Sequence, residues 1–108
     1  MVDVSRVTAL QEILNQNPND AFARYALGLE YSGAGDAEAA LKQFEELLAA
    51  HPDYTNGYFM SAQTLDRVGR TTEARAMLQK GIEAARRTNN RHAQAEMEAM
   101  LEELQLRD

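Results

Sequence analysis

The sequence contains no cysteine and no tryptophan, and it has only two prolines in 108 residues. Without cysteine the chain has neither a disulfide framework nor thiol chemistry, which fits a reducing compartment. Because proline breaks helices and is scarce here, long stretches of the chain are free to be helical. Alanine, leucine, glutamate, glutamine and arginine are abundant and favour helices. We therefore expect an all-helical protein.

Basic residues are outnumbered by acidic ones, 11 against 17, and the net charge is −6. This balance argues against nucleic acid as the main partner. No apolar stretch approaches the length of a membrane span. The first residues, MVDVSRVTAL, lack the basic flank and long apolar run of a signal peptide. We expect a single soluble, cytoplasmic domain that binds neither nucleic acid nor a membrane.

What the sequence does contain is a pattern that repeats after 34 residues. Gly35 falls on Gly69, and Pro18 falls on Pro52. The same offset relates Tyr25 to Phe59, Ala40 to Ala74, Phe44 to Leu78 and Leu48 to Ile82. A fixed period of this length indicates stacked helix pairs, each covering the apolar face of its neighbour. Such stacks mainly present binding surfaces, which favours a binding protein over an enzyme.

Apolar residues at spacings of three and four predict six helices joined by short loops. The predicted helices cover residues 4–16, about 20–32, 37–50, 53–68, about 72–87 and 91 onward. Asp3 and Asp36 are expected to cap two of them, and Thr71 or Thr72 is expected to cap the fifth. Gly28 lies in the middle of a helix, where glycine costs about 1 kcal/mol relative to alanine. It therefore indicates a close approach of another part of the protein to the helix backbone.

These residues resemble the tetratricopeptide repeat, whose 34-residue pattern has a bulky residue at position 4, Leu-Gly at 7 and 8, Tyr at 11, Gly at 15, Ala at 20, an aromatic at 24 and Pro at 32. Counted from Ala21, the chain supplies Leu27, Gly28, Tyr31, Gly35, Ala40, Phe44 and Pro52. Counted from Thr55, it supplies Tyr58, Ala62, Leu65, Gly69, Ala74 and Leu78. Arg86 stands where the second proline would be, which predicts a longer fifth helix.

The resemblance implies an all-α fold, a right-handed superhelical stack of antiparallel helix pairs with about six helices. It divides the single domain into a half repeat at 1–18, repeats at 21–54 and 55–88, and a C-terminal capping helix at 89–108.

The resemblance also implies a binding groove, because the family's positions 2, 5, 9 and 12 face the concave side of the stack. The matching residues are Phe22, Tyr25, Leu29, Ser32, Asn56, Phe59, Gln63 and Asp66, and the count continues into the last helix at Asn90, Ala93 and Met97. The aromatic and leucine side chains would form an apolar floor. Such a floor suits an amphipathic helix or an extended apolar peptide of a protein partner.

Other arrangements remain open at this point. The last helix could fold over the apolar strip and fill it, or two copies could bury their strips in a symmetric dimer that serves as a scaffold. An enzyme with an active site in the groove is a further alternative. The chain shows no Ser-His-Asp grouping, metal triad or phosphate loop, so we expect no enzyme, no cofactor and no metal site.

Some relatives grip the carboxylate end of a peptide with lysine, asparagine and arginine. The matching positions here are Tyr25, Leu29, Met60, Asn90 and Gln94, and none of them carries the residue type that those relatives use at that position. We therefore do not expect this chain to bind a carboxylate end in that way.

Two weaker patterns involve basic residues near the C-terminus. Arg86, Arg87 and Arg91 could hold an acidic peptide or phosphate, but such clusters more often complement the end of a helix. His92 and Glu96 share a helix face and are expected to form a solvated surface pair.

Overall fold

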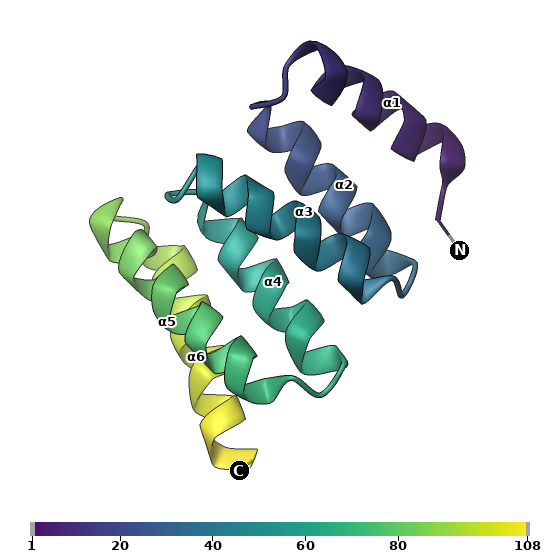
Figure 1. The fold of residues 1–108 in the computed structure, drawn as a ribbon. Helices are drawn as coiled ribbons and strands as arrows, with labels where there is room; N and C mark the ends of the chain where they lie inside the picture. The colour runs from purple at the N-terminus through teal and green to yellow at the C-terminus, as the bar shows by residue number, and fades with distance from the viewer. Residues whose placement is uncertain (1, 108) are drawn as a thin grey trace.

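The computed structural model describes residues 2–107, and all regular secondary structure in that range is helical (Figure 1). Six helices follow one another across the described range. They are α1 (Val4–Gln16), α2 (Ala21–Gly33), α3 (Ala37–Ala50), α4 (Thr55–Arg67), α5 (Thr71–Arg87) and α6 (Arg91–Arg107). The predicted fold class, an all-α stack of helix pairs, is confirmed.

Acidic side chains begin three of the helices. The carboxylates of Asp3, Asp20 and Asp36 each accept a hydrogen bond from the backbone amide three residues later, at 3.2, 2.9 and 3.2 Å. These bonds satisfy amides that have no partner inside the helix. The expected threonine cap of α5 was wrong, because the helix already includes Thr71 and the preceding residue, Arg70, makes no side-chain cap bond. The guanidinium of Arg70 binds Glu73 in the first turn instead.

Left-handed residues end α2, α4 and α5. Gly35, Gly69 and Asn89 have φ angles of 83°, 81° and 57°. In each case the next amide bonds back to a carbonyl five residues earlier: Asp36 to Tyr31 at 2.9 Å, Arg70 to Leu65 at 2.9 Å, and Asn90 to Ala85 at 2.8 Å. This 6→1 bond is the mark of a Schellman ending, which glycine and asparagine favour. The tight turns at Gly35 and Gly69 reverse the chain within each helix pair.

The helices form two layers. Consecutive helices pack against each other in antiparallel order, and α2 and α6 also contact α4 (Figure 1). Thus α2, α4 and α6 make up the inner layer, while α1, α3 and α5 make up the outer layer. The short dimension of the molecule, 19 Å, matches two layers of helices about 10 Å thick.

The fifth helix is longer than its counterpart and shifts the last one. As expected from the missing proline, α5 has 17 residues against 14 in α3. Helix α4 begins 34 residues after α2, but α6 begins 36 residues after α4. The last helix therefore begins two residues later than the 34-residue repeat predicts.

The core of the first helix pair is built on a close contact between Gly28 and Phe44. The ring of Phe44 is fully buried, and a Cβ atom placed on Gly28 would lie 2.4 Å from its Cε1 atom. Carbon atoms cannot approach so closely. The expectation of a close approach at Gly28 is confirmed, with the partner now identified as an aromatic ring.

We expect Gly28→Ala to destabilise the protein by about 1–2 kcal/mol. Overpacking of a tight core costs about 1–3 kcal/mol, and the better helix propensity of alanine returns up to about 1 kcal/mol. The measurement is urea unfolding followed by circular dichroism. Gly33→Ala is the matched control in the same helix, because a Cβ atom placed on Gly33 would have no other atom within 4 Å. Equal stability of the two variants would contradict the role given to Gly28.

Candidate functional site

A groove runs between α4 and α6 on the inner layer. Its volume is about 600 Å³. We call it the inner groove; it is lined by Phe59, Gln63, Asp66 and Arg67 from α4 and by Glu96, Ala99, Met100, Glu103 and Arg107 from α6. It exists because α6 packs mainly against α5 and touches α4 over a short stretch.

The inner face of α2, which neighbours α4 but not α6, is not covered by the last helix. Phe22 is 70% exposed, while Tyr25 and Leu29 are half-buried. Among the described helices α6 has no contact with α2. The last helix therefore forms a wall of the groove and does not cover the strip on α2, contrary to one of the alternatives considered above.

Seven of the predicted site residues have side chains that reach the surface on α2 and α4. Phe59, Gln63 and Asp66 line the inner groove. Asn56 is exposed in the first turn of α4, at the position that Phe22 holds in α2. Together with the half-buried Tyr25 and Leu29, they lie along two neighbouring helices of the inner layer.

Ser32 does not face the groove as expected. Its side chain is buried, and its hydroxyl lies 3.0 Å from the hydroxyl of Thr64. The guanidinium of Arg67 donates to the Ser32 carbonyl at 3.1 Å. The residue thus ties α2 to α4, because a buried hydroxyl must find hydrogen-bond partners.

The expected groove positions in the last helix are also corrected. Ala93 and Met97 are buried, with exposures of 6% and 1%, and the sulfur of Met97 packs beside Gly81 of α5. Asn90 is the N-cap of α6 and accepts a hydrogen bond from the Ala93 amide at 3.1 Å. The cause is the offset of α6, since a strict count of 34 places these residues two positions too early.

Sequence reasoning therefore missed the whole α6 side of the groove, as well as Arg67. The signal that could have found it was the missing proline at Arg86. That departure predicted a longer fifth helix, but the extra residues were not carried into the count for the next helix. Adding two residues moves the expected position from Met97 to Ala99, which does line the groove.

Arginines join the inner helices near their C-terminal ends. Arg107 of α6 binds the carboxylate of Asp66 on α4 at 3.0 Å. Arg67 of α4 reaches Ser32 on α2 in a similar way. These bonds set the spacing of the inner helices at one end of the groove.

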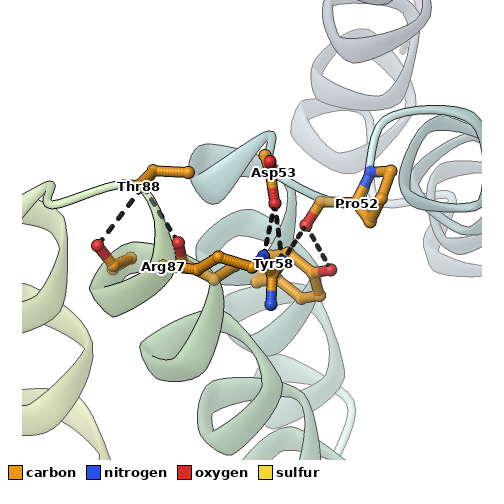
Figure 2. Close-up of polar contacts among 7 residues, drawn as sticks. Pro52, Asp53, Tyr58, Arg87 and Thr88 are labelled. Atoms are coloured by element: carbon orange, nitrogen blue, oxygen red, sulfur yellow. Dashed lines mark hydrogen bonds and ion pairs between the residues drawn. The ribbon is translucent and has the colours of Figure 1, made fainter.

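The opposite edge of the stack is held by a polar cluster around Pro52 (Figure 2). The Tyr58 hydroxyl donates to the Pro52 carbonyl at 2.7 Å, and Arg87 donates to the same carbonyl at 3.3 Å. Arg87 also binds the carboxylate of Asp53 at 2.6 Å. The loop between α3 and α4 is thereby fixed to the end of α5.

Of the basic cluster noted in the sequence, Arg86 and Arg87 bind carboxylates of the chain itself. Arg86 pairs with Glu98 at 3.5 Å, and Arg87 pairs with Asp53. His92 and Glu96 form the exposed pair that their spacing predicts, 3.4 Å apart.

Among residues 2–107 no three histidine, cysteine, aspartate or glutamate side chains gather as metal ligands would. Over the same range no helix combines the length and apolar character needed to cross a membrane.

A second hollow of about 610 Å³ lies on the outer layer between α3 and α5. Its floor includes Tyr58, Ser61 and Leu65 of α4, which belong to the buried core. On its rim Arg70 is paired with Glu73 and lies 3.3 Å from Glu38. The helix pattern did not predict this hollow, because it assigned the outer helices only a buried stripe.

The paired helices, the 34-residue offset and the Gly28 contact all describe one kind of repeat. A sequence profile described as tetratricopeptide repeat matches residues 31–101. The chain belongs to the tetratricopeptide repeat family. This family is generally a fold for protein–protein interaction and not for catalysis.

Two known proteins are similar to this chain in sequence, and one of them is named for the same repeat. A tetratricopeptide repeat-containing protein of Pseudomonas aeruginosa is 26% identical over 98 residues, which cover 91% of this chain and 93% of the relative. An uncharacterized protein of Methanocaldococcus jannaschii is 32% identical over 69 residues, or 64% of this chain and 80% of that protein.

Solved structures have the same architecture. The crystal structure of a tetratricopeptide repeat domain protein from Salinibacter ruber is 32% identical, with a TM-score of 0.74 and coverage of 80% of this chain and 96% of that one. The solution structure of a protein from Bordetella parapertussis reaches a TM-score of 0.82 at 24% identity, covering 94% and 89% of the two chains, and supports the fold alone.

Three tyrosines of this tetratricopeptide repeat protein have raised pKa values. Burial is the main cause for Tyr25, Tyr54 and Tyr58. The rings of Tyr25 and Tyr54 also lie 5.3 Å apart, so ionisation of Tyr54 raises the pKa of Tyr25 further. Arg87 opposes the effect of burial on the pKa of Tyr58.

We expect the free energy of unfolding to fall as the pH rises above about 10, the usual tyrosine pKa. The unfolded chain releases these protons first, so the stabilisation is complete below that pH and is lost as the pH rises through the folded pKa values. Urea unfolding between about pH 8 and about pH 11 measures the slope. A variant with phenylalanine at Tyr25, Tyr54 and Tyr58 should show a smaller slope, and an unchanged slope would contradict this explanation.

Proposed function

We propose that this tetratricopeptide repeat protein is a non-catalytic module that binds a segment of another protein on its inner layer. The observation that carries the proposal is the open groove that α6 borders but does not cover, together with the exposed ring of Phe22 on α2, the helix that neighbours α4 in the same layer. Exposed aromatic and apolar groups on one face are a common feature of a protein-binding surface.

The size and lining of the inner groove favour a particular mode of binding. A volume of about 600 Å³ accommodates a few side chains and is too small to enclose a whole helix. Phe59, Ala99 and Met100 offer apolar contacts, while Gln63 offers an amide for hydrogen bonding. An amphipathic helix that lays its apolar face along α4 and α6 fits this combination, as does an extended apolar segment.

Self-association is the alternative, in which a second copy covers Phe22 and the groove. Sedimentation velocity at several concentrations separates the two. A mass that rises to that of a dimer, and returns to that of the monomer in Phe22→Ala, would favour the dimer.

The test of binding uses peptides selected from a phage-displayed library against the unmodified protein. We expect Phe22→Ala to lower the affinity for the selected peptides by roughly ten- to hundredfold, because burying a phenylalanine ring contributes about 1.5–3 kcal/mol. Fluorescence anisotropy measures the dissociation constants. Because Phe22 is exposed, its replacement should leave the unfolding temperature nearly unchanged.

Val4→Ala is the matched control, since Val4 has the same 70% exposure but lies on α1 in the outer layer. Binding that survives both Phe22→Ala and Phe59→Ala would refute the proposed site.

A further inference from the structure

We infer that the segment bound in the inner groove is a helix whose apolar face is flanked by cationic side chains. This inference rests on the proposed function and specifies its partner. Its basis is the order of side chains along the wall that α6 contributes.

That wall alternates between acidic and apolar groups. Glu96 and Glu103 are seven residues apart, and Ala99 and Met100 lie between them. Seven residues make two helical turns, or about 10.5 Å, so all four side chains lie on one face of α6. A partner helix with two lysines or arginines seven residues apart, on either side of an apolar residue, has the matching spacing.

The basic groups of the groove are directed to acceptors within the chain. Arg107 binds the carboxylate of Asp66 at 3.0 Å. Arg67 donates to the carbonyl and the hydroxyl of Ser32, at 3.1 and 3.3 Å. The positive charge in the groove thus lies near the C-terminal ends of α4 and α6, away from the Glu96 end.

Neither glutamate forms an ion pair with a lysine or arginine of residues 2–107, and Arg107, one helical turn after Glu103, binds Asp66. Among residues 2–107 no ion pair includes Glu103. Glu96 lies 3.4 Å from the imidazole of His92, which is 87% exposed. A cationic partner would supply the missing counter-charges.

The opposite wall and the whole molecule favour the same partner. The α4 wall carries the uncharged Phe59 and Gln63 before the Asp66 and Arg67 end, so that part of the wall suits the apolar face of a bound helix. The net charge of −6 attracts cationic segments over a longer range and speeds their association.

The test uses three synthetic helical peptides with one shared apolar face, flanked by lysine, glutamine or glutamate. We expect the lysine peptide to bind most tightly and the glutamate peptide most weakly. Each of Glu96→Gln and Glu103→Gln should lower the affinity for the lysine peptide about two- to fivefold. Neither substitution should change the affinity for the glutamine peptide. The preference for lysine should also shrink at high salt, because these charges are exposed.

Glu12→Gln on α1 is the matched control. It changes the net charge by the same amount but lies in the outer layer, away from the groove. If Glu12→Gln weakens the lysine peptide as much as Glu103→Gln does, the attraction comes from the net charge and the inference is refuted. Glutamine or glutamate peptides that bind as tightly as the lysine peptide refute it as well.

Phe59→Ala separates this inference from the proposed function. If all three peptides bind equally and Phe59→Ala abolishes their binding, the groove is the binding site but the cationic preference fails. If the peptides bind equally well to Phe59→Ala and to the unmodified protein, the groove itself fails as the site. No binding of any peptide at millimolar concentration would refute both.

Discussion

The contact between the Phe44 ring and the backbone of Gly28 is the constraint on which the first helix pair depends. Because glycine has no side chain, the inner helix can come close enough for a large ring to fill the space between the two layers. In the second helix pair Ala62 and Leu78 stand at the corresponding positions, and both are fully buried. The two facing residues there differ less in size than Gly28 and Phe44 do. A large residue opposite a small one thus recurs in both pairs and keeps the core densely packed.

This close packing also determines where a binding surface can form. It places α2, α4 and α6 side by side, and the bonds of Arg67 and Arg107 hold them there at one edge, while Arg87 fixes the loop between α3 and α4 to the end of α5 at the other. The inner groove is therefore bordered by helices that are fixed by core packing. A bound segment would meet a surface that is already formed, which lowers the entropy cost of association.

The spacing of apolar residues predicted the six helices, and the 34-residue period predicted their pairing and the glycine turns, because these features follow from residue size and helix periodicity alone. It failed where the structure departs from the period. Counting positions could not show that the Ser32 hydroxyl has a buried partner in Thr64. The position 34 residues before Thr64 is Glu30, so the repeat gives no sign of a hydroxyl there. The count also failed in α6, because Arg86 in α5 stands where a proline follows α3, and the longer α5 shifts the residues of α6 by two. On α2 and α4 the predicted residues other than Ser32 reach the surface, whereas Ala93 and Met97 on α6 are buried.

The two-residue offset of α6 removes the translational symmetry of the inner layer. A segment lying across α2 and α4 would meet residues related by 34 positions, but on reaching α6 it would meet residues that lie 36 positions after those of α4. Corresponding residues also differ in type, as Phe22 and Asn56 do. A bound segment shifted by one repeat would therefore not find the same contacts again, and the surface would favour one register over the others, which an array of identical repeats could not do.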